Sequence, residues 1–176
     1  MKLSKLGELA VIAIVVVLVV LCVQYTKRTY YGNDGVVIRA ESKPMLNEVP
    51  VEVKATIAEV HGILDDLLGW GADEEFQFTD SDKEQLKDAV DKMDGVPPPS
   101  SDFLREDLQN AQDLLTFGVM REDLKAIQYA YRILNDLDIA FNDYFGDKVW
   151  HYSLAGAGNG KNVEKVRKYL NLTDNG

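Results

Sequence analysis

The chain has 176 residues, and its 19 basic and 29 acidic side chains give a formal net charge of −10. An acidic excess of this size repels phosphate, so no nucleic acid is expected among the partners. The single cysteine, Cys22, excludes an intramolecular disulfide and any zinc site built from cysteines. The length beyond the first 26 residues suits one domain with a substantial core.

The N-terminal part of the chain has the composition of a membrane segment. Residues 9–23 carry no charge and consist almost entirely of Val, Ile, Leu and Ala, and basic residues flank the run on both sides. About 20 helical residues are needed to cross a hydrocarbon core of about 30 Å, and residues 6–25 reach that length. We therefore expect residues 1–26 to be an uncleaved signal anchor that contacts the lipid bilayer through residues 6–25.

Two other interpretations of this N-terminal segment stay open. A cleaved secretory signal has the same basic start and apolar centre, although the end of the run lacks the small-x-small pattern of a cleavage site. A lipoprotein signal would use Cys22, although Leu21 occupies a position that is normally small. Large domains after a first anchor are exported largely regardless of charge, so a single-pass protein with an extracytoplasmic domain is expected.

Residues 27–50 form the predicted juxtamembrane spacer, and residues 51–176 form the predicted acidic helical domain. The spacer contains the turn signal Gly32-Asn33-Asp34-Gly35 between two short apolar stretches. This pattern fits a small hairpin and a flexible spacer equally well, because two isolated strands are marginally stable in water.

The helical domain begins with two amphipathic stretches. In the first, Pro50 is expected to occupy the opening position of a helix that ends near Gly69. The second is expected from Thr79 to Asp94, where Ser81 and Glu84 have the spacing of a capping box. Apolar residues recur at helical spacing in both, which predicts one buried face for each helix.

Three further helices are predicted in the second half of the domain. One is expected to begin at a serine cap, Ser100 or Ser101, and to end at Gly118. Two neighbouring apolar stripes between Arg121 and Phe145 predict the longest, central helix, packed on two sides. Residues 162–170 form a short last helix. Overall the sequence predicts an all-α fold, with one transmembrane helix followed by a four- or five-helix bundle.

The segment between the last two helices invites a phosphate-loop interpretation. Residues 148–154 are predicted as a short strand or extended arm, and Gly160-Lys161 resembles the end of a phosphate-binding loop. Ala155, however, stands where the first glycine is required, and Asn162 replaces the Ser or Thr that binds magnesium. The glycine-rich stretch is therefore interpreted as a flexible loop before a terminal helix.

Two small groups of polar residues have spacings that metal sites also use. Asp80, Asp82 and Glu84 alternate like the first ligands of a calcium loop, but helix capping is the favoured interpretation. His61 and Asp65 lie one helical turn apart, whereas a metal site needs three or four convergent ligands. The pair is expected on the exposed surface of its helix.

Five aromatic residues fall in predicted loops, where they are expected to fold back onto the helical core more often than to bind a partner: Trp70, Phe76, Phe78, Trp150 and Tyr152. Acidic helices of this kind usually place their carboxylates in solvent.

No catalytic, cofactor-binding or metal-binding residue is assigned from the sequence. The leading hypothesis is a membrane-tethered, non-enzymatic helical interaction or scaffold protein, prokaryotic or viral, with a protein partner of unknown identity. The alternative is an exported, lipoprotein-like ligand-binding domain, or an enzyme that uses an unrecognised carboxylate cleft.

Overall fold

A computed structural model describes residues 48–69, 76–144 and 148–173 of the chain. The predicted membrane anchor and the predicted hairpin of the spacer lie outside these residues. Among the helices that are described, none is both long and apolar enough to cross a membrane.

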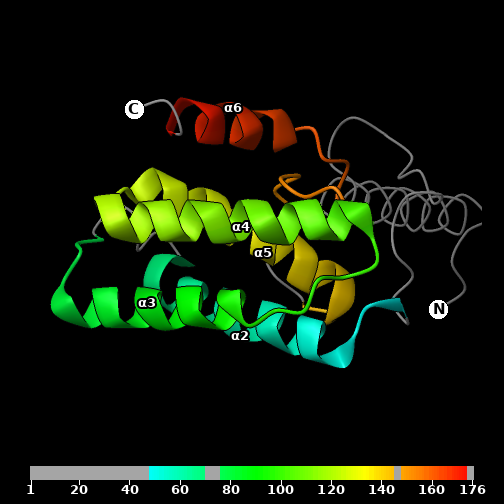
Figure 1. Cartoon of the computed structure of the whole chain (residues 1–176), viewed down its shortest axis with the longest axis horizontal. Coiled ribbons are helices and arrows are strands. Elements are labelled where there is room, and N and C mark those ends of the chain that lie inside the picture. The colour runs from blue at the N-terminus through cyan, green and yellow to red at the C-terminus, as the bar shows by residue number, and fades with distance from the viewer. Residues whose placement is uncertain (1–47, 70–75, 145–147, 174–176) are drawn as a thin grey trace, which may run out of the picture. The chain divides into compact units, whose positions relative to one another are not determined.

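The described residues form five helices and no strand, which confirms the predicted all-α class. Each of the first three helices contacts the next, and the first also contacts the fourth, so these four close a bundle. Consecutive helices of the bundle run in opposite directions, and the fifth helix lies against α4 (Figure 1). The helices are α2 (Val51–Leu68), α3 (Asp80–Asp94), α4 (Asp102–Arg121), α5 (Leu124–Phe141) and α6 (Val163–Thr173).

A single aliphatic core fills the space between these helices. The four bundle helices each contribute at least three buried apolar side chains, and α6 adds Val163 and Val166. Burial of a Leu, Ile or Val side chain stabilises a fold by about 1.5–3 kcal/mol. The largest apolar side chains that are fully buried are Ile57, Leu64, Leu86, Leu104, Leu114, Leu115, Ile127, Ile133, Leu134 and Leu137.

Helices α3, α4 and α5 each begin at a side-chain cap. Ser101 caps α4 as predicted, because its hydroxyl accepts the N–H of Leu104 at 3.4 Å. The capping box of α3 uses Thr79 and Asp82, so the predicted pairing of Ser81 with Glu84 is wrong. The actual box starts two residues earlier, where the chain is still extended and the cap can turn its side chain toward the first free N–H groups.

Gly118 does not end α4, contrary to the prediction. The helix continues to Arg121 and stops at Glu122, whose φ of 53° is left-handed. A Cβ on Gly118 would lie 2.3 Å from Cδ1 of Ile127, so the glycine instead permits close packing of α4 on α5. Helix α5 then begins after Asp123 and ends at Phe141, and it is therefore shorter than the predicted 121–145.

Helix α6 is fixed to α4 and α5 by an ion pair and by aromatic contacts. The Arg167 guanidinium donates to Glu106 of α4 at 2.8 Å. The ring of Tyr169 packs edge-on against Tyr129 of α5, with centroids 5.2 Å apart. The short terminal helix is thus part of the folded unit rather than a projecting tail.

Candidate functional site

The connection between α5 and α6 is held by two buried carboxylates. Asp107 of α4 is fully buried, and its oxygens accept the backbone N–H groups of Leu154 and Ala155 at 2.8–2.9 Å. Asp136 of α5 is also fully buried. Its oxygens accept the N–H groups of Trp150 at 2.7 Å and Tyr152 at 2.6 Å. We call these two carboxylates, with the backbone of residues 150–155, the loop clamp.

The clamp explains why residues 148–154 form no strand. Their N–H groups bond to side-chain carboxylates rather than to a neighbouring strand. Further bonds fix the same stretch: Asn135 donates to the carbonyl of Lys148, and Asn162 donates to that of Trp150, at 2.9 and 2.8 Å. The strand alternative of the sequence prediction is therefore wrong, and the segment is irregular, with His151 at a left-handed φ of 63°.

Burial is the main influence on the ionisation of Asp136 in the clamp. It raises the pKa of the Asp136 carboxyl to about 8, against the opposing effect of the N–H donors and with a smaller rise from nearby Asp107. Removing a carboxylate from water disfavours its charged form, whereas accepted hydrogen bonds favour it. The clamp thus contains a carboxyl group that titrates close to neutral pH.

The glycine-rich stretch is packed, not open. A Cβ on Gly156 would lie 2.2 Å from Oγ of Ser153. Gly158 has a φ of +94°, and a Cβ there would meet Nδ1 of His151 at 2.4 Å. The N–H of Ala157 donates to the carbonyl of Asp136, and that of Asn159 donates to His151. A phosphate loop would offer such N–H groups to its ligand, so these bonds favour the interpretation as a connecting loop, although one fastened to the core.

His61 is buried, which corrects its predicted place on the helix surface. Its side chain is 1% exposed, and Nδ1 lies 2.8 Å from Oδ2 of Asp138 on α5. Because a carboxylate only accepts, the imidazole N–H donates in this pair. Asp138 also accepts from Asn142 at 2.8 Å. The predicted partner, Asp65, lies on the same helix but does not pair with His61.

Two tyrosines connect Asp65 to the surroundings of His61. The hydroxyl of Tyr131 donates to Asp65 at 2.6 Å, and its ring stacks on the imidazole with centroids 5.5 Å apart. Tyr144 packs edge-on against the same imidazole at 4.8 Å. Nε2 of His61 is buried and has no hydrogen-bond partner. The enclosed histidine therefore joins α2 to α5 and offers no exposed nitrogen to a substrate.

Of the residues considered as calcium ligands, Asp82 belongs to the capping box of α3 and Asp80 lies in the first turn of that helix. Asp82 accepts from both the N–H and the hydroxyl of Thr79, at 3.2 and 2.7 Å. Within the described ranges, no group of three His, Cys, Asp or Glu side chains converges in a way that would hold a metal ion.

The loop aromatics pack as expected wherever they are described. Phe76, Phe78 and Trp150 lie partly buried against the core, and Tyr152 is 7% exposed. The Arg132 guanidinium lies 4.9 Å from the centroid of the Trp150 ring, a cation–π distance. Trp70 lies outside the described residues.

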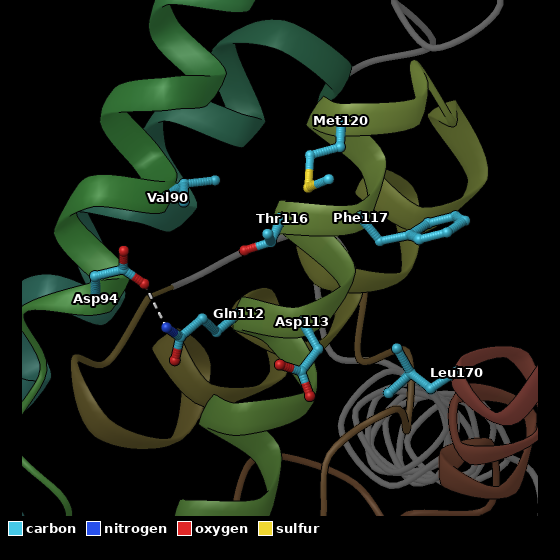
Figure 2. A pocket seen from close by; sticks show the side chains of 8 residues that line it. All are labelled: Val90, Asp94, Gln112, Asp113, Thr116, Phe117, Met120 and Leu170. Atoms are coloured by element: carbon cyan, nitrogen blue, oxygen red, sulfur yellow. Dashed lines mark hydrogen bonds between the residues drawn. The ribbon is translucent and has the colours of Figure 1, made fainter. Parts of the chain in front are cut away.

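An open groove of about 550 Å³ runs along α4, between α3 and α6 (Figure 2). Helix α4 supplies most of its surface from positions on neighbouring turns, and α3 and α6 form its sides. The lining residues are Val90 and Asp94 of α3, Gln112, Asp113, Thr116, Phe117 and Met120 of α4, and Leu170 of α6.

The groove combines apolar, acidic and uncharged polar side chains. Met120 is 74% exposed, which is unusual for a large apolar side chain. Asp94 and Asp113 are exposed and accept bonds from the glutamines Gln112 and Gln109, the latter at 2.9 Å. No lysine or arginine lines the groove. None of these residues belongs to a recognisable sequence motif, so the sequence does not predict a site here.

No protein family, curated protein or solved structure matches this chain.

Proposed function

We propose that the protein is a membrane-tethered, non-enzymatic interaction module whose helical domain binds a protein partner in the groove along α4. The observation that carries this proposal is the exposure of Met120 within a groove that also holds Phe117 and Leu170. Exposed apolar side chains that gather in a groove and are bordered by polar ones are typical of protein interaction sites.

The polar chemistry of the interior supports a non-enzymatic role. Asp107 and Asp136 hold backbone N–H groups, and His61 pairs with Asp138. A catalytic group needs access to its substrate within hydrogen-bond reach. These side chains are each at most 4% exposed and are engaged in holding the fold.

The tether adds an effective-concentration advantage to this proposal. A domain confined near a membrane by residues 1–26 meets a membrane-bound partner at a higher local concentration than a free domain does. Even a groove of modest size then achieves useful occupancy.

Site-specific photocrosslinking in native membranes tests the groove. A benzophenone amino acid replaces Met120 in one variant and Phe103 in a matched one; Phe103 lies on the same helix, is 38% exposed and does not line the groove. We expect a discrete protein adduct from position 120 that is absent from position 103. Identical patterns from both positions, or no protein adduct at position 120, would contradict the proposal.

Membrane fractionation tests the tether separately. We expect the full chain to stay in the membrane fraction after alkaline extraction, and a variant lacking residues 1–26 to become soluble. Protease added to intact cells is expected to cleave the helical domain, because the domain is proposed to lie outside the cytoplasm. Protection that ends only on lysis would place the domain on the cytoplasmic side.

A further inference from the structure

We infer that the occupant of the groove is a basic amphipathic helix. This inference deepens the proposed function and rests on it, since it names the chemistry of the partner that the groove along α4 binds. It depends on the shape, the apolar content and the charge of the groove.

The shape of the groove suits a helix. Its α4 residues, from Gln112 to Met120, recur over more than two turns of the helix. At 1.5 Å per residue this stripe is about 12 Å long. Helices α3 and α6 border it on opposite sides, as Figure 2 shows for Val90 and Leu170. A helix that binds such a groove contacts it through residues three and four positions apart.

The apolar part of the groove is adaptable. Val90, Phe117, Met120 and Leu170 offer contacts to leucine-like side chains of a partner. Methionine is unbranched and polarizable, so it fits side chains of different shape and is common at helix-binding surfaces. The exposed Met120 would lose its contact with water when a partner covers it.

The charge of the groove selects the sign of the partner. Asp94 and Asp113 are its only ionisable lining residues. Helix α3, which forms one side, carries six acidic and three basic side chains, and the whole chain has a net charge of −10. Complementary charge favours a partner rich in lysine or arginine and disfavours an acidic helix or an anionic lipid surface.

A designed peptide tests this inference. The probe is a fluorescent peptide of about 18 residues, with leucine along one helical face and lysine elsewhere. Its matched counterpart carries glutamate in place of lysine. Binding to the full chain in nanodiscs of zwitterionic lipid is measured by fluorescence anisotropy, with empty nanodiscs as the blank. We expect the lysine peptide to bind saturably and the glutamate peptide not to bind.

Paired substitutions locate the binding. Met120→Gln is expected to weaken binding of the lysine peptide about fivefold or more, because it removes an exposed apolar contact of the groove. Val51→Gln is the control, since Val51 is 76% exposed and lies outside the groove. Asp113→Lys is expected to weaken binding more than Asp66→Lys, which makes the same charge change on an exposed residue of α2.

Any of three results would overturn the inference that the occupant is a basic helix. Equal weakening by Asp113→Lys and Asp66→Lys would show general attraction between opposite charges. If the chain formed a dimer that Met120→Gln dissociated, the occupant would be a second copy. If position 120 formed a specific crosslink in membranes but neither peptide bound, the proposed interaction function would stand and only the basic-helix assignment would fail.

Discussion

Carboxylates have opposite surroundings in the loop clamp and in the groove. Asp107 and Asp136 are fully buried and accept backbone N–H groups from the segment between α5 and α6. Asp94 and Asp113 are exposed. Each accepts a hydrogen bond from the side-chain amide of a glutamine. The same functional group therefore fixes the fold in one region and remains accessible to a partner in the other.

Burial, rather than residue type, therefore decides what an acidic side chain does in this protein. Removing a buried acceptor leaves its donors without water or a partner, and each such group costs about 1–3 kcal/mol. Removing an exposed acceptor lets water take its place.

The largest expected effect comes from breaking the clamp. We expect Asp136→Ala to lower the free energy of unfolding by at least about 3 kcal/mol, because the N–H groups of Trp150 and Tyr152 lose their acceptor. The matched variant Asp113→Ala is expected to change it by less than about 0.5 kcal/mol. Urea denaturation of the full chain in zwitterionic micelles measures both. Similar losses in the two variants would remove the distinction between the regions.

The clamp is also expected to respond to pH. The pKa of Asp136 is raised from 3.8 to about 8, so the folded state binds a proton that the unfolded state has released over this range. Stability from this group is therefore fully present below about pH 4 and is lost as pH rises toward 8.

The ideal slope for one proton is about 1.4 kcal/mol per pH unit, so stability falls by at most about 3 kcal/mol between pH 5 and pH 7. The carboxyl ¹³C resonance of Asp136 follows its ionisation directly and is expected to titrate near pH 8. A carboxyl that stayed ionised down to pH 4, together with stability that did not change, would show that the N–H donors outweigh burial.

Two helical glycines extend the contrast between interior and surface. Gly118→Ala is expected to destabilise the fold by about 2 kcal/mol, because the new Cβ would meet Ile127 in the interior. Gly62→Ala, on the exposed face of α2, has nothing within 4 Å of its Cβ and is expected to stabilise by about 0.5–1 kcal/mol. Thermal unfolding measures both shifts, and changes of the same sign would contradict the packing described at Gly118.

Helix periodicity and the serine cap of α4 were predictable from the sequence because both depend on local spacing, whereas the capping box of α3 was predicted two residues too late. The serine cap at Ser101 and the all-α class follow from nearest-neighbour chemistry alone. Gly118 was misinterpreted because its role depends on Ile127, a residue of the next helix. A glycine that ends a helix and a glycine that permits close packing have the same local signature.

The buried polar residues were not predictable by the same means. Asp136 and Asp138 lie among Ile133, Leu134 and Leu137 on a helix whose apolar faces already indicated a central position. That signal was present, but the general tendency of carboxylates to face solvent led to the opposite expectation. Their partners come from distant parts of the chain, such as the backbone near Trp150 and the side chain of His61, and spacing cannot show such contacts.

The loop clamp recognises the backbone of residues 150–155 and not their side chains. Every amino acid except proline carries the N–H groups that Asp107 and Asp136 accept at Trp150, Tyr152, Leu154 and Ala155. The conformation of the segment is therefore encoded largely outside the segment itself, on α4 and α5. In a mutational library we therefore expect the half-buried Leu154 to tolerate substitution better than the two distant aspartates.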